Sequence, residues 1–251
     1  MRNLIIKTVL SATLLSTALF ASEGNHWGYT GHHDPSHWGE ISEKYKMCSE
    51  GKNQSPINIE PSVVVSTSGL EPIKFNYKAT STEVINNGHT IQVNFASGST
   101  IHIDGRDFEL KQFHFHTPSE NQIGGKHFAL EGHFVHLDNK GNIAVVAVMF
   151  EDKSKDNLLI AKIWNAMPHK AGGKEKYSIT ADEVSEILPK NKEYYRFTGS
   201  LTTPPCSEGV RWFVLKESVK ISHEQVEAFL HVMHHPNNRP VQKINARKVL
   251  Q

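Results

Sequence analysis

The sequence predicts a mainly β fold, a β-rich α+β protein, and two patterns carry this prediction. From about residue 84 onward, short segments alternate apolar and polar residues and are separated by Gly or by turn pairs such as Asp104-Gly105. Only three segments have the spacing of amphipathic helices. The 251 residues are 38% apolar, enough to bury a large core. No Pro-, Gly- or Ser-rich linker divides the chain, so we predict a single domain.

The alternating segments predict six strands, at 90–95, 100–103, 110–116, 129–137, 143–150 and 211–214. The segment 143–150 is apolar throughout, which is typical of a central strand buried on both faces.

Three peripheral helices are predicted. The first, 155–167, has an apolar face formed by Leu158, Leu159, Ile163 and Trp164. The second, 181–188, follows a capping box of Thr180 and Glu183, and the third, 223–233, follows one of Ser222 and Gln225.

The first 21 residues have the pattern of a secretory signal peptide. Arg2 and Lys7 precede an uncharged, mostly apolar run over 8–20, which ends before Ala21. The alternative is an uncleaved anchor, but the apolar run is short for crossing a bilayer. We expect cleavage after Ala21, a mature domain over 22–251 without membrane insertion, and a periplasmic or otherwise secreted location.

Charge excludes one class of partner. The chain has 27 Lys and Arg residues against 26 Asp and Glu residues, so it has no excess of positive charge to bind a phosphate backbone. We therefore expect no nucleic-acid partner.

The chain has two cysteines, Cys48 and Cys206. In an exported protein an even number of cysteines favours disulfide formation, and one intrachain pairing is available. The alternative is two unpaired buried thiols.

Three of the 16 histidines have the spacing of a metal site. His114 and His116 are two residues apart on a predicted strand and project to the same face. His133 lies on the next predicted strand and joins them if the two strands pair. Three imidazoles leave one zinc position open, which is typical of a catalytic site.

Each of the two strands also carries a residue that can orient its histidine. Gln112 lies two positions before His114, and Glu131 lies two before His133. Either can accept the remaining N–H group of its histidine and so fix the tautomer. The competing interpretation is that all three are ordinary half-exposed sheet histidines. Of the others, we expect His32, His33 and His37 to be surface or entry-loop residues, 234–235 (HH) to lie in a polar tail, and His136 to point away from His133.

An ordered series of motifs resembles the α-class carbonic anhydrases, in particular exported bacterial members. The series covers nearly all of the mature chain. It consists of 26–29 (HWGY), 54–59 (QSPINI), 86–89 (NNGH), 112–116 (QFHFH), Ser119-Glu120, 131–136 (EGHFVH), 200–205 (SLTTPP) and 238–240 (NRP).

The resemblance implies a twisted, mostly antiparallel central sheet and one zinc ion per chain. It implies reversible hydration of CO2 to bicarbonate and a proton by zinc-bound hydroxide, with weak esterase activity. Sulfonamides and small anions are the expected inhibitors, and exported relatives often form homodimers. The cysteines stand where exported bacterial members carry their disulfide.

The resemblance also assigns roles to individual residues. Thr202 should accept the hydrogen of the hydroxide and donate its own to Glu120. His89 matches the proton shuttle, with Tyr29 and Gln92 ordering its water chain; Gln92 replaces the Asn common in familiar members. The expected substrate pocket, for which core packing is the competing interpretation of the apolar residues, is formed by Val135, Val145, Leu201, Thr203, Val210 and Trp212.

Two alternatives from other classes remain. One is a non-catalytic zinc-binding or interaction protein on the same fold. The other is a protein whose main activity is ester hydrolysis, although the sequence has no legible oxyanion-hole motif or specificity pocket. Stopped-flow CO2 hydration with and without zinc separates these alternatives from the predicted enzyme.

Overall fold

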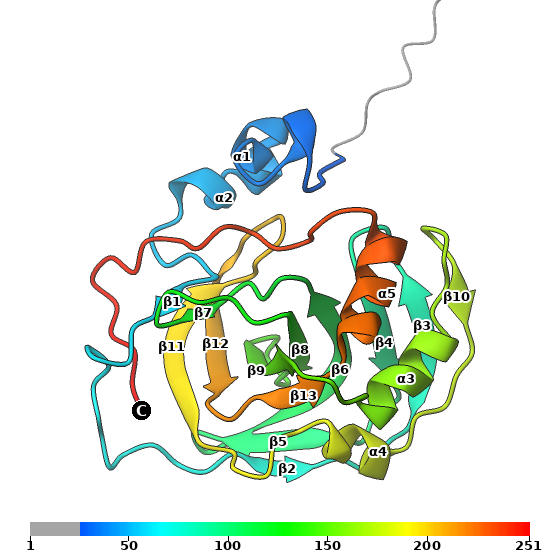
Figure 1. Ribbon diagram of the computed structural model, residues 1–251. Helices are drawn as coiled ribbons and strands as arrows, with labels where there is room; N and C mark the ends of the chain where they lie inside the picture. Colours follow the sequence, from blue (N-terminus) through cyan, green and yellow to red (C-terminus); the bar gives the residue numbers. More distant parts are fainter. Residues whose placement is uncertain (1–25) are drawn as a thin grey trace, which may run out of the picture.

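The computed structural model describes residues 26–251, and one eleven-stranded sheet dominates it (Figure 1). The predicted signal peptide over 1–21 lies outside the described residues. The main path through the sheet is β10-β3-β4-β6-β8-β9-β12-β11; β5 also pairs with β6, β2 with β5, and β13 with β9. The strands are β2 (Lys74–Asn76), β3 (Ser81–Asn86), β4 (Ile91–Phe95), β5 (Thr100–Ile103), β6 (Arg106–His116), β8 (Leu130–Leu137), β9 (Ile143–Asp152), β10 (Lys174–Glu175), β11 (Tyr194–Ser200), β12 (Glu208–Leu215) and β13 (Val219–Ile221).

The predicted mainly β class is confirmed. Most neighbouring strands run antiparallel; β9 is the exception, because it pairs in parallel with both β12 and β13. As its apolar sequence predicts, β9 is central and almost entirely buried. A separate two-stranded parallel sheet joins β1 (Asn58–Ile59) to β7 (Gln122–Ile123).

All six predicted strands are present, and the largest difference concerns β6. It begins at Arg106, because residues 106–109 pair with β5 directly after the Asp104-Gly105 turn. The alternation rule also missed seven strands of two to seven residues within 26–251, including β11. Residues 194–200 alternate poorly, and their position beside β12 rather than local pattern makes them a strand.

The three predicted helices are present as α3 (Leu158–Asn165), α4 (Ala181–Glu186) and α5 (His223–Met233). Both predicted capping boxes form. The α3 helix begins three residues later than predicted because the Asn157 side chain accepts the N–H of Ile160 and caps it there. Figure 1 shows α3 and α5 side by side along one side of the sheet.

The two faces of the sheet are covered by different parts of the chain. The three helices cover one face, where Phe113, Phe115 and Phe134 point into the larger core. The opposite face carries a smaller apolar cluster around Val145 and Trp212, covered by loops and by β1 rather than by these helices. Because β8 alternates between the faces, a residue beside Phe134 in sequence, such as His133, points to the side without helices.

Short helical turns form the N-terminal part of the described chain: η1 (Gly31–His33), α1 (Trp38–Ile41), η2 (Glu43–Tyr45) and α2 (Met47–Glu50). Trp38 is fully buried in this part of the chain. No helix within 26–251 is both long and apolar enough to span a membrane.

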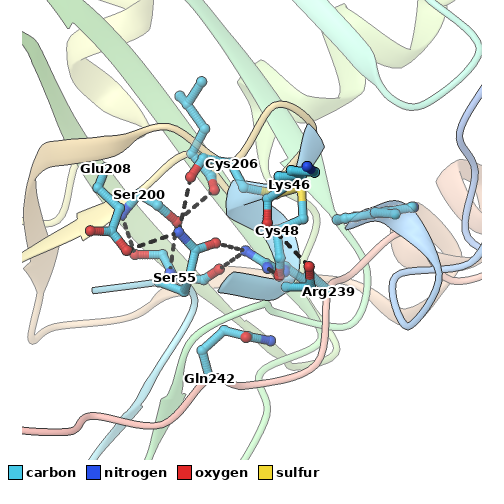
Figure 2. Close-up of a disulfide and its surroundings, with 12 residues drawn as sticks. Lys46, Cys48, Ser55, Ser200, Cys206, Glu208, Arg239 and Gln242 are labelled. Carbon is cyan, nitrogen blue, oxygen red and sulfur yellow. Dashed lines mark hydrogen bonds between the residues drawn. A yellow bond between two sulfur atoms is a disulfide. The ribbon is translucent and has the colours of Figure 1, made fainter. Parts of the chain in front are cut away.

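The predicted disulfide between Cys48 and Cys206 is confirmed (Figure 2). It joins α2 to the loop that follows β11, and both sulfur-bearing residues are buried. The sequence separation is 158 residues. For a loop of this length the chain-entropy model gives an upper stabilisation of about 5 kcal/mol.

Candidate metal centre

Three histidine side chains converge on one face of the sheet where β6 pairs with β8. His114 pairs directly with His133 across the β6–β8 ladder, and the register shifts between Leu110 and Gln112. Leu110 therefore packs in the helix-covered core, while His114 and His116 face the other side of the sheet together with His133. The ligand atoms of the three imidazoles all lie within 4.8 Å of one another.

Each imidazole has its second nitrogen beside an oxygen atom. His114 Nδ1 lies 2.8 Å from Gln112 Oε1, and His133 Nε2 lies 2.9 Å from Glu131 Oε1. His116 Nδ1 lies 2.7 Å from the backbone oxygen of Asn237. These contacts direct Nε2 of His114 and His116 and Nδ1 of His133 toward the shared centre.

Glu131 is itself held by three donors. Its Oε2 accepts the backbone N–H groups of Glu120 and Asn121, and its Oε1 accepts the side-chain amide of Asn121. A carboxylate fixed in this way can orient the ring of His133 without moving.

The electrostatics favour neutral imidazoles. Burial lowers the pKa of all three histidines, most strongly for His114 and His133. The charge of His116 lowers the pKa of each of these two further. A metal requires a deprotonated imidazole nitrogen, so the unprotonated rings are ready for coordination.

The residues present fit a zinc ion. His116 Nε2 is buried and has no hydrogen-bond partner, although an unpaired buried polar atom is costly. Three convergent nitrogens, each ring oriented through its other nitrogen, form the donor set of an open catalytic zinc site. This cluster is the one group of metal-ligating residues within 26–251 that meets these distances.

A buried carboxyl group lies against the centre. Glu120 Oε2 is 3.5 Å from His116 Nε2 and 3.9 Å from His133 Nδ1. Burial raises the pKa of Glu120 well above its usual range, opposed by the backbone N–H of Arg239 and by a side-chain hydrogen bond with Thr202. The structure thus brings together the predicted pair of Glu120 and Thr202 beside the three histidines.

Seven of the residues predicted from the sequence share one cavity of about 130 Å³. The predicted residues that line it are Tyr29, His89, Gln92, Gln112, His114, His116 and Thr203, and they are joined by Trp27, Asn87 and Thr90. The hydroxyl of Tyr29 is buried without a hydrogen-bond partner, and burial raises its pKa well above its usual range.

The five predicted apolar pocket residues lie in the smaller apolar cluster. Val145, Val210 and Trp212 are buried there, whereas Val135 and Leu201 are partly exposed. The Trp212 ring meets the His133 ring edge to face at 4.9 Å. The cluster therefore continues up to the metal centre, although none of the five lines the cavity described above.

His89 lies at the wall of the cavity and stacks on Trp27, with 3.7 Å between ring centroids. Burial lowers its pKa to about 4, and the charges of His26 and His235 add to this effect. In this position His89 is neutral at pH 7.

The comparisons with known proteins identify the family. The model of eukaryotic-type carbonic anhydrases matches residues 33–251. The chain belongs to this carbonic anhydrase family. The resemblance predicted from the motifs is confirmed.

Bacterial carbonic anhydrases are among the similar proteins. A carbonic anhydrase of Neisseria gonorrhoeae is 50% identical over 244 residues, covering 97% of this chain and 94% of that protein. One from Klebsiella pneumoniae is 46% identical over 97% of this chain and 96% of that protein. The solved α-carbonic anhydrase of Thermovibrio ammonificans, in complex with the inhibitor sulfanilamide, has 50% identity and a TM-score of 0.87 over 90% of this chain and 99% of that one.

Two residues at this carbonic anhydrase site were not found by the sequence reasoning. Asn237 supplies the oxygen beside His116, and its side chain also bonds the backbone at Thr117, Phe115 and His89. Arg239 donates its backbone N–H to Glu120 Oε1 at 2.8 Å. Both lie in the irregular segment after α5, where no apolar periodicity marks them. The 238–240 motif, which contains Arg239, was the sequence signal that pointed to this segment.

Proposed function

We propose that this protein catalyses the zinc-dependent, reversible hydration of CO2 to bicarbonate and a proton. The observation that carries the proposal is the convergence of three neutral, oriented imidazoles beside the Glu120 and Thr202 pair. Such a centre offers three nitrogen ligands and leaves room for a reacting molecule.

His114, His116 and His133 would hold the ion. When bound, zinc supplies hydroxide at neutral pH, because in carbonic anhydrases it lowers the pKa of a water molecule to about 7, a value known for the family rather than obtained from this structure. Because the three ligands are neutral, they leave the charge of the ion largely uncompensated.

Thr202 and Glu120 would orient the attacking oxygen. If Glu120 accepts the Thr202 hydrogen, the Thr202 hydroxyl oxygen can act only as an acceptor toward the nucleophile. That arrangement turns a lone pair of the nucleophile toward the substrate. The ionised form of Glu120 is required for this role, and a cation bound beside it favours that form.

The substrate would lie against Val135, Val145, Leu201, Val210 and Trp212. CO2 has no net dipole, so an apolar surface next to the histidines can accept it without losing hydrogen bonds to water. Weak hydrolysis of activated esters would follow from the same nucleophile and remain a secondary activity.

Stopped-flow CO2 hydration by the purified protein, before and after removal of zinc, tests this function, with metal content measured in parallel. Rapid hydration that is lost on chelation and restored by added zinc supports the proposal. A folded, zinc-loaded protein without hydration activity would instead favour a non-catalytic zinc-binding protein on this fold.

His89 is the proposed proton carrier, and His89→Ala is expected to lower kcat roughly 10-fold or more with little change in kcat/KM. A carrier must titrate near pH 7. The stacked position, where its pKa is about 4, therefore represents the neutral, receiving state, and leaving Trp27 for water would raise the pKa toward its usual value.

Imidazole buffer is the check on this prediction, because a small external base replaces the missing side chain. Titration of imidazole into the His89→Ala variant should restore kcat. His102→Ala, which removes a histidine from β5 at a distance from the cavity lining, serves as the matched control. A variant whose kcat does not respond to buffer would refute the shuttle role.

We further propose an exported protein in which residues 22–251 form one catalytic domain after removal of 1–21. The Cys48–Cys206 disulfide supports this location, because such bonds persist in oxidising compartments. CO2 and bicarbonate are the proposed ligands, with sulfonamides and small anions as inhibitors. Assembly into homodimers is part of the same proposal.

A further inference from the structure

Arg239 is a buried cation whose role the proposed mechanism does not use. The residue is 1% exposed, and its guanidinium lies 5.7 Å from the centroid of the Trp38 ring. Nη1 donates to Gln54 Oε1 at 2.9 Å and to the Ser55 carbonyl at 2.8 Å, and Nη2 donates to the Cys48 carbonyl at 2.7 Å. All three acceptors are neutral, so the side chain acts here as a rigid donor fork and not as half of an ion pair.

The backbone of the same residue touches the site. Arg239 N–H donates to Glu120 Oε1 at 2.8 Å, between residues 119 positions apart in the chain. The location of Glu120 therefore depends on where the backbone of residue 239 lies. That backbone belongs to an irregular segment without strand neighbours. Asn237 and the N–H of Gln242 tie the segment on either side, and the guanidinium contacts anchor residue 239 itself.

The acceptors of the guanidinium also hold the loop that carries Thr202. Gln54 Nε2 donates to the Cys206 carbonyl at 2.9 Å. The N–H of Ser55 donates to Ser200 Oγ, and the N–H of Ser200 donates to Ser55 Oγ. Figure 2 shows these bonds around Arg239 and the disulfide. Both ends of the loop from Ser200 to Cys206 are thus tied to residues 54 and 55.

Cys48 links Arg239 to the Cys206 end of the Thr202 loop. Its carbonyl accepts from Arg239, and its sulfur is bonded to Cys206 at the end of the Thr202 loop. Arg239 therefore contacts both sides of the Glu120 and Thr202 pair. Its guanidinium binds residues 48, 54 and 55, which hold the Thr202 loop, and its backbone N–H binds Glu120.

We propose that Arg239 is a positioning residue for CO2 hydration, which holds Glu120 in register with the Thr202 loop. This inference rests on the proposed function of that pair. Glu120 must meet the Thr202 hydroxyl at hydrogen-bond distance, and Arg239 ties both to one rigid frame. Lysine cannot replace arginine here, because one ammonium group cannot reach three acceptors in a fixed fork.

The test is kcat/KM for CO2, per bound zinc, in the Arg239→Lys variant. We expect a decrease of roughly 10- to 100-fold at unchanged zinc content, because small displacements of reacting groups cost factors of this size. Arg247→Lys is the matched control: Arg247 belongs to the same C-terminal segment and donates to the carbonyls of Ile244, Lys243 and Thr198, without contact to Glu120 or the disulfide. It should retain the kcat/KM of the unmodified protein.

A double-mutant cycle with Thr202→Val separates positioning from general stabilisation. If Arg239 acts through the pair, Arg239→Lys has no further effect on kcat/KM once the Thr202 hydroxyl is absent. Equal losses in both backgrounds, or a kcat/KM equal to that of Arg247→Lys, would overturn the proposal. Should Arg239→Lys fail to fold, Gln54→Met removes one acceptor of the guanidinium and goes through the same cycle with the same criteria.

Two other measurements show whether the proposed function itself is wrong. If the zinc-loaded, unmodified protein does not hydrate CO2, or if Thr202→Val alone retains full kcat/KM, the assigned roles of Thr202 and Glu120 are wrong. The inference about Arg239 fails only when those two measurements behave as expected and the Arg239 variants do not.

Discussion

Replacement of His133 by alanine is expected to remove zinc from the protein and, with it, nearly all hydration of CO2. The change leaves two imidazoles and removes the ring that lies 2.9 Å from Glu131 Oε1. Without the ion the pKa of water is not lowered, so hydroxide is too scarce at pH 7 and the rate should fall roughly 1000-fold or more. Metal analysis of the dialysed variant and stopped-flow hydration measure the two effects.

His136→Ala is the matched control for this variant. His136 lies on the same strand and is fully buried, but it faces the other side of the sheet, where its Nε2 lies 3.0 Å from the Tyr77 hydroxyl. Its loss should lower stability while zinc and hydration are retained. Stoichiometric zinc in folded His133→Ala protein would contradict the ligand assignment, and lost zinc in His136→Ala would show that stability alone explains the effect.

Enlargement of Val135 to tyrosine is expected to block CO2 hydration while leaving zinc bound. Val135 follows His133 by two positions on β8, so both project to the same face, and Val135 is only partly buried. A phenol ring added there would fill the apolar surface proposed for the substrate. We expect a decrease in kcat/KM on the order of 100-fold, at full zinc content.

Val219→Tyr places the same bulk on a partly exposed valine of β13, which packs on the helix-covered face instead. It should hydrate CO2 at the rate of the unmodified protein. Full activity of a folded Val135→Tyr protein would refute the assignment of the substrate pocket and leave core packing as the role of Val135.

The clustering of the three histidines could be predicted from the sequence because their arrangement is local. A period of two places His114 and His116 on one face, and the next long strand supplies His133. The bulge at residue 111 was not predicted, since the register of a strand depends on its partner. The alternation of β6 nevertheless resumes after the bulge, so the face shared by the two histidines was inferred correctly.

The roles of Asn237 and Arg239 could not be predicted from the sequence, because their contacts to the site are non-local. Asn237 and Arg239 reach the site through hydrogen bonds that join residues 121 and 119 positions apart. Neither residue lies in a periodic segment. Strands β2, β10 and β13 were missed for a related reason: each has only two or three residues, too few for a period to be detected.

The distance along the chain between these contacts has a consequence for the order of folding. Strands β6 and β8 are joined by residues 117–129, a far shorter separation than that of the C-terminal contacts, so their three histidines can assemble early and at low entropic cost. Arg239 and Asn237 follow α5 in the chain and join the site through contacts that span 119 and 121 positions, which cost more entropy to close. We therefore expect a refolding chain to acquire affinity for metal before it acquires turnover, with the C-terminal segment completing the enzyme.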